Sequence, residues 1–144
     1  WSRRVTPSSY EIGLDLYKNA IECLVKVNES EGVHVDRESM YWLIASLYRN
    51  RARIESEMEL NEDAKRDLVK SIDYEDGNVD AWLMLSEVCL RLSESVGDSN
   101  EEQSRVAFEK AMEINPSLRK QGQKQRAGIV ESDRRKKSWW NLFG

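Results

Sequence analysis

Two stretches of the chain resemble each other when the sequence is shifted by 40 residues. The shift places four pairs of like or identical residues together: Trp42 on Trp82, Ser46 on Ser86, Leu68 on Phe108, and Ile72 on Met112. A unit this short cannot bury its apolar side chains alone, so neighbouring units must stack on one another. The shift therefore predicts a chain built from repeated structural units.

The apolar residues within these stretches recur every three or four positions, which is the spacing of an amphipathic helix. The chain's two prolines, Pro7 and Pro116, both lie at predicted helix boundaries. We therefore expect an all-α protein with six helices. The first runs from about Ser9 to Asn28 behind the capping box Ser8-x-x-Glu11, the second follows the N-cap Asp36, and the third follows the N-cap Asn61. The fourth ends near Gly97, the fifth runs from the capping box Ser99-x-x-Glu102 to Ile114, and the sixth starts at Pro116.

Composition and charge describe a soluble globular chain with two electrostatic parts. Of the 144 residues, 40% are hydrophobic and 33% are charged, which is enough apolar content for a core in one domain. The net charge of -4 is unevenly divided: the eight basic and two acidic residues from Arg119 onward give that part +6, and the remainder carries -10. An acidic body with a basic end should attract different surfaces at its two ends.

The repeated residues resemble the pattern of the tetratricopeptide repeat family. The second unit carries this pattern on Trp82, Leu85, Ser86, Ser104, Phe108, Ala111 and Pro116, and the first unit carries a weaker form on Trp42, Ala45, Ser46, Ala64, Leu68, Ser71 and Asp76. Each unit departs from the family in length, since it spans 40 residues where about 34 are usual. The longer period leaves open another helical array of the HEAT or armadillo type.

The resemblance implies an α-solenoid of antiparallel helical hairpins with a C-terminal capping helix. Its domain would span residues 8–135, divided into a partial unit over 8–32, a unit over 36–76, a unit over 78–116 and a capping helix over 116–135. Residues 136–144 would form a basic and aromatic tail.

The resemblance also implies a partner-binding groove lined by the first helix of each unit. Mapped onto this chain, the groove residues are Met40, Leu43, Leu47, Asn50 and Arg51 in one unit and Asp80, Leu83, Glu87, Leu90 and Arg91 in the next. Family members that hold the carboxylate terminus of heat-shock proteins use Lys, Asn and Arg at such positions, and the leucines here do not supply that clamp. The alternative for these leucines is packing against neighbouring helices.

Catalytic, metal-binding and cofactor-binding patterns are absent from the sequence. The single His34 lies in a polar loop, and we expect the acidic residues Glu55, Glu57 and Glu59 to form a solvated helix face. Cys23 and Cys89 lie among apolar residues, which predicts buried thiols, with a disulfide pair as the second choice. We therefore expect a non-enzymatic chain without cofactors or metals in a reducing, cytoplasmic compartment, and an organelle interior stays open as an alternative.

The chain's end combines cations with large apolar side chains, and we expect it to make contacts. The residues concerned are Arg134, Arg135, Lys136, Lys137, Trp139, Trp140 and Phe143. Exposed rings of this kind usually mark an interface. A contact with this chain or with a partner protein is favoured over contact with an anionic membrane surface.

Taken together, these patterns predict a protein-interaction scaffold that binds a peptide or helix of a partner, as part of a longer protein or of a multi-subunit assembly. One alternative is a peripheral membrane adaptor that uses the tail. A second is a helical-repeat RNA-binding module, which the body's charge of -10 disfavours because it repels phosphates.

The membrane alternative has its own test, which is co-sedimentation with anionic liposomes before and after deletion of residues 134–144. If the tail binds protein, the intact and the shortened chain should both stay in the supernatant. Sedimentation of the intact chain alone would support the membrane adaptor instead.

Overall fold

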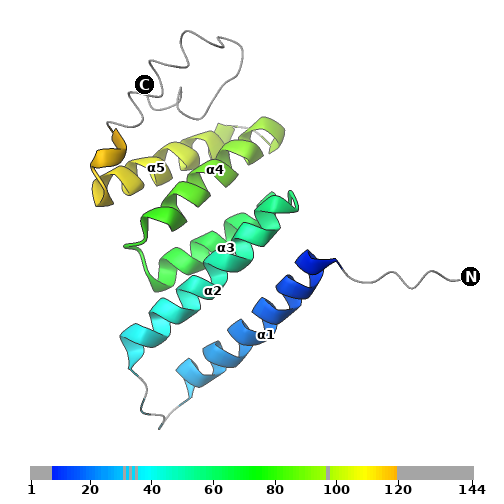
Figure 1. Cartoon of the computed structure of the whole chain (residues 1–144). Helices are drawn as coiled ribbons and strands as arrows, with labels where there is room; N and C mark the ends of the chain where they lie inside the picture. Colours follow the sequence, from blue (N-terminus) through cyan, green and yellow to red (C-terminus); the bar gives the residue numbers. More distant parts are fainter. Residues whose placement is uncertain (1–7, 31, 33, 35, 97, 120–144) are drawn as a thin grey trace, which may run out of the picture. The chain divides into compact units, whose positions relative to one another are not determined.

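The structure is a computed structural model that describes residues 8–30, 32, 34, 36–96 and 98–119. Within these ranges the chain forms helices and no strand, which confirms the predicted all-α class (Figure 1). The helices are α1 (Ser9–Glu29), α2 (Arg37–Glu57), α3 (Asn61–Tyr74), α4 (Val79–Val96) and α5 (Asp98–Ile114), followed by a helical turn over 117–119. The predicted continuation of a sixth helix and the predicted tail contacts of Arg134 to Phe143 lie outside the described residues.

The signals that start the first two helices act as the sequence predicts. The backbone N–H of Glu11 donates to Ser8 Oγ at 3.3 Å, and the backbone N–H of Ser8 donates to Glu11 Oε2 at 3.0 Å. These two bonds form a capping box at the start of α1. Asp36 caps α2 by accepting a hydrogen bond from the backbone N–H of Glu38 at 3.2 Å.

Two predicted caps are wrong. Asn61 is the first residue of α3, and Leu60 occupies the cap position without a side-chain hydrogen bond. The chain turns sharply here, because Glu59 has a positive φ of 61° and the N–H of Leu60 donates to Glu55 O at 2.8 Å. The fifth helix starts at Asp98, so Ser99 lies inside the helix and not at its cap.

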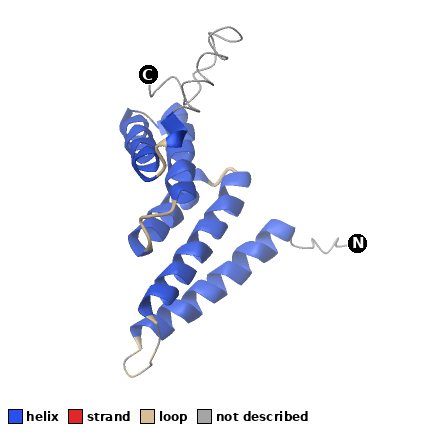
Figure 2. Cartoon of the chain, turned by 60° about the vertical axis from the view of Figure 1, so that its left-hand side comes forward, coloured by secondary structure: helices blue, strands red, loops and turns tan. Residues whose placement is uncertain are grey.

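The chain divides into two compact units between Asp76 and Gly77. In the first unit α1 packs against α2, and α2 packs against α3 (Figure 2). In the second unit α4 packs against α5.

The core of the first unit is built from aliphatic and small side chains. Its buried apolar residues are Ile21 from α1, Met40, Ile44, Ala45 and Ala52 from α2, and Ala64 and Leu68 from α3. The small side chains allow α2 and α3 to approach closely, and Ser71 Oγ donates to the carbonyl oxygen of Ala45 at 2.8 Å. This bond satisfies a buried hydroxyl without opening the core.

The second unit has a corresponding contact between α4 and α5. Ser86 Oγ donates to Ser104 O at 2.9 Å, and Ser104 Oγ lies 2.7 Å from Ser86 O. Both serines are fully buried, so small residues bring the two helices together at this point. The surrounding buried apolar residues are Ala81, Leu85, Val88, Cys89 and Leu92 from α4 and Ala107, Phe108 and Ala111 from α5.

Helix geometry explains two side chains that are more exposed than expected. Trp42, which we expected between hairpin partners, is 56% exposed. It lies two residues from both Met40 and Ile44, and a step of two residues turns a side chain by about 200° around a helix. Cys23 is exposed for the same reason, since it lies two residues from the buried Ile21, while Cys89 is buried as predicted.

The predicted solvated acidic face is wrong for one of its members. Glu55 is only 8% exposed and lies among the buried polar residues of the first unit. It follows Ile44 by 11 residues, which is about three full turns of helix, so the two side chains share a face. Glu57 and Glu59 are exposed.

Candidate functional site

Three tyrosines from two helices lie next to one another along one side of the first unit. The ring centroids of Tyr41 on α2 and Tyr74 on α3 lie 5.7 Å apart. The ring of Tyr48, two turns further along α2, stacks on Tyr74 at 6.1 Å with an angle of 17° between the planes. Tyr74 therefore bridges two rings of α2, and we call Tyr41, Tyr74 and Tyr48 the tyrosine row.

One end of the tyrosine row already holds a cation. The guanidinium carbon of Arg51 lies 5.5 Å from the Tyr48 ring centroid, within the range of a cation–π contact. The same guanidinium forms a two-point ion pair with Asp67 on α3, through Nε to Oδ2 at 2.6 Å and Nη2 to Oδ1 at 2.7 Å. Ring and carboxylate together fix this cation between α2 and α3.

Glu55 adjoins this ion pair as a buried acid. Burial, and then the hydrogen bond and the negative charge of Asp67, raise the pKa of Glu55 to about 9. Its Oε1 has no hydrogen-bond partner among the described residues. We therefore expect the Glu55 carboxyl to be protonated at neutral pH, so that the group contributes no second negative charge beside Asp67.

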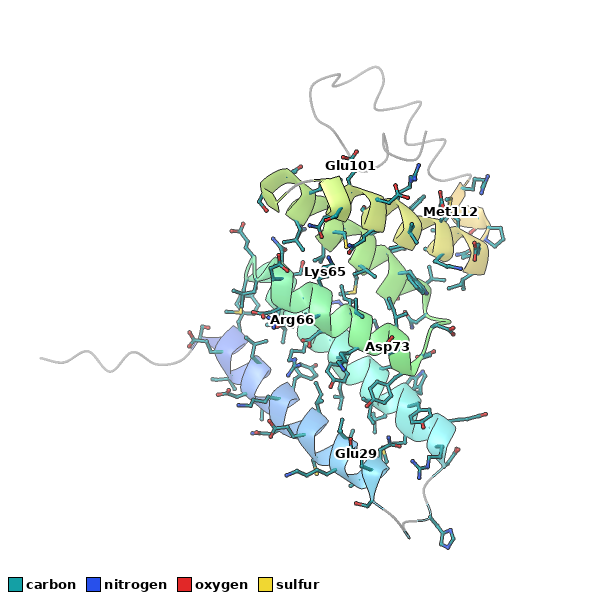
Figure 3. All side chains as sticks on the ribbon, turned by 180° about the vertical axis from the view of Figure 1, so that it is seen from behind. Glu29, Lys65, Arg66, Asp73, Glu101 and Met112 are labelled. Carbon is teal, nitrogen blue, oxygen red and sulfur yellow. The ribbon has the colours of Figure 1, made fainter. Side chains whose placement is uncertain are left out.

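The other end of the tyrosine row borders a pocket of about 460 Å³. We call it the first-unit pocket, and its walls come from the start of α2 and the end of α3: Glu38, Tyr41, Trp42, Ile72, Asp73, Tyr74, Glu75 and Asp76. Figure 3 shows Asp73 near the end of α3, with Lys65 and Arg66 toward the opposite end of that helix. This volume falls within the range of about 300–1,000 Å³ that is usual for ligand pockets.

Rings and acids line the first-unit pocket, and none of its eight lining residues is a lysine or arginine. Three are aromatic and four carry carboxylates. Trp42 is 56% exposed and Tyr41 is 38% exposed, so their surfaces are accessible. The Oε2 of Glu75 is buried and has no hydrogen-bond partner among the described residues.

The groove residues predicted in the first unit lie in different environments. Met40 is 8% exposed and belongs to the core, so its predicted place in a groove is wrong. Arg51 is held by Asp67 and Tyr48, while Leu43 is 40% exposed. Leu47 and Asn50 are half-buried, and the Asn50 amide oxygen accepts a hydrogen bond from Arg53.

The groove residues predicted in the second unit all lie on α4. Asp80 and Glu87 are exposed, and Glu87 forms an ion pair with Arg91 at 2.7 Å. Leu83 and Leu90 are half-buried. These five residues belong to a different unit from those on α2.

Sequence reasoning missed most of the first-unit pocket. Of the run Tyr74, Glu75 and Asp76, only Asp76 is singled out from the sequence, as a position of the repeat pattern. The signal that points to the pocket is the combination of this aromatic and acidic run with the adjacent rings of Tyr41 and Trp42.

Neither a cluster of metal ligands nor a membrane-spanning helix is found in the described part of the chain. No group of three or more His, Cys, Asp or Glu side chains gathers there in a way that could hold a metal ion. Among the described helices, none combines the length and the apolar character that crossing a membrane requires. No protein-family model matches the sequence, and no curated protein matches it either.

Proposed function

We propose that this chain is a non-enzymatic protein-interaction scaffold, a tetratricopeptide-like array of helical hairpins, whose first unit binds a peptide or helix of a partner. The observation that carries the proposal is the run of Tyr41, Trp42 and Leu43. These successive apolar side chains are 38%, 56% and 40% exposed on α2. Each step of one residue turns a side chain by about 100° around the helix, so Trp42 lies between Tyr41 and Leu43. Exposed apolar surface is favourable to bury, and tryptophan and tyrosine are the residues that most often dominate the binding energy of interfaces.

The stacked array is supported by exposed apolar surface on α1. Ile12 and Leu16 are 50% and 64% exposed, and their spacing of four residues places them on one face of the helix. In a repeat array such a face is covered by a neighbouring helix. The small-residue contacts in both hairpins fit the same proposal, because they allow the close helix pairs from which such arrays are built.

The double variant Trp42→Ser/Leu43→Ser tests the proposed binding surface. We expect affinity for partners captured by the unchanged chain to fall at least about tenfold, because the apolar surface that they bury is lost. Folding should persist, since neither side chain belongs to the buried core. Partners would be identified by mass spectrometry after affinity capture, and their affinities would then be measured with purified components.

A matched control is the double variant Leu60→Ser/Val69→Ser, which removes apolar side chains that are 39% and 42% exposed in the same unit. It should retain the same partners. Equal retention by both double variants would place the binding surface elsewhere and would contradict the proposal.

A further inference from the structure

We propose that the first-unit pocket binds one cationic side chain, a lysine or an arginine, that a partner polypeptide supplies. This inference rests on the proposed function, because it names the chemistry that the partner must present beside the apolar run. It adds a charge requirement that exposed apolar residues alone do not impose.

The first unit itself contains a filled example of this chemistry. At one end of the tyrosine row, the Arg51 cation lies against the Tyr48 ring and is paired with the Asp67 carboxylate. At the other end of the row, the first-unit pocket offers the same kinds of groups, with Tyr41 and Tyr74 as rings and several carboxylates around them. The cation is the component that its lining residues do not supply.

The acids of the pocket gather where the helix backbone also favours positive charge. Asp73 lies in the last turn of α3, Glu75 and Asp76 follow it, and that last turn contains no basic residue. The C-terminal end of a helix carries partial negative charge on its free carbonyl groups, and it attracts cations. The acidic side chains and the backbone at this helix end therefore both attract a cation.

Glu75 offers a specific hydrogen-bond acceptor for the cation. Its Oε2 is buried without a hydrogen-bond partner among the described residues, and a buried acceptor in that state destabilises the structure until a donor reaches it. Glu75 itself is half-buried, so a turn of its carboxylate would bring this oxygen to an ammonium or guanidinium group in the pocket. The alkyl stem of that cationic side chain would lie against the exposed Trp42 ring, in the way that long cationic side chains cover apolar surface.

The test uses small probes and the full isotope-labelled chain, followed by nuclear magnetic resonance. The probes are N-acetyl-lysine methylamide, N-acetyl-arginine methylamide and the uncharged N-acetyl-norleucine methylamide. We expect saturable shifts with at least one cationic probe, centred on the Trp42 indole N–H and the amides of residues 72–76, with binding at least about tenfold tighter than for norleucine. Equal binding of norleucine, or shifts scattered over both units, would overturn the proposal.

Charge variants provide the matched comparison. Asp73→Asn/Glu75→Gln should weaken binding of the cationic probe at least about tenfold, whereas Glu22→Gln/Glu62→Gln, which removes two exposed acids outside the pocket, should leave it within about twofold. Equal weakening by both pairs would show that only the overall charge matters, and would contradict a built site. The comparison with norleucine uses the unchanged chain, so the proposal stays testable even if a variant folds poorly.

Two further outcomes separate this inference from its alternatives. If the cationic probes bind only after Arg134, Arg135, Lys136 and Lys137 are replaced by glutamine in the full chain, then the chain's own end fills the pocket, and the proposal of a partner is overturned. If Trp42→Ser/Leu43→Ser releases partners while the cationic probes never bind, the inference fails and the proposed function stands. If the probes bind and partners ignore that variant, the proposed function fails alone.

Discussion

Replacing Phe108 by alanine is expected to destabilise the second unit by about 3–5 kcal/mol. Phe108 is 2% exposed and is the largest side chain among the buried residues of the described chain. Its companions on the buried side of α5 are Ala107 and Ala111, whose methyl groups are too small to fill the cavity that the ring would leave. The loss therefore combines the transfer of the ring to water with the cost of an open cavity.

Urea unfolding followed by helical circular dichroism measures this loss. Val106→Ala is the matched control, because Val106 lies two residues before Phe108 on α5 and is 44% exposed, so its truncation should cost less than about 0.5 kcal/mol. Trp82 is half-buried, so Trp82→Ala should cost less than Phe108→Ala. Unchanged midpoints for Phe108→Ala would show that the ring is not part of the core, and would remove the main support for the repeat interpretation.

The features that the sequence predicted correctly are those that depend on residues close to one another along the chain. The capping box of Ser8 and the cap at Asp36 depend on residues within three positions, and both are confirmed. To predict whether a side chain is buried, one must know which face of its helix is covered by other helices. Trp42 was therefore expected in the core, and Glu55 on a solvated face, although the structure places them the other way round.

The candidate site could not be predicted from the sequence, because its residues come together only after α3 folds back along α2. Tyr41 and Tyr74 are 33 residues apart in the sequence and 5.7 Å apart as rings. No pattern of neighbouring residues in the sequence predicts that these two rings lie close together. The acids after Tyr74 look like an ordinary polar turn until the start of α2 is placed beside them, and only then do they form a wall of the first-unit pocket.

Glu55→Gln is expected to stabilise the first unit by about 1–3 kcal/mol at neutral pH. The folded-state pKa of Glu55 is raised to about 9 from an ordinary value of 4.5, with burial as the main cause. Between these two values the unfolded chain releases the proton while the folded chain keeps it, so the stability that this group provides falls as pH rises. Glutamine has the same size, has no proton to lose, and can still donate a hydrogen bond to Asp67.

The measurement is urea unfolding of both chains at about pH 5, pH 7 and pH 8.5. The difference between them should be small near pH 5, because that pH lies close to the ordinary pKa of 4.5, and should grow toward pH 8.5. Glu62→Gln, which alters an exposed acid on α3, should show no such trend. A difference that stays constant with pH would contradict the protonated state, and a loss of stability at pH 7 would show that Glu55 is ionised and acts as a second partner of Arg51. A growing advantage for glutamine would instead show that the first unit retains a buried acid whose ionisation opposes its folding.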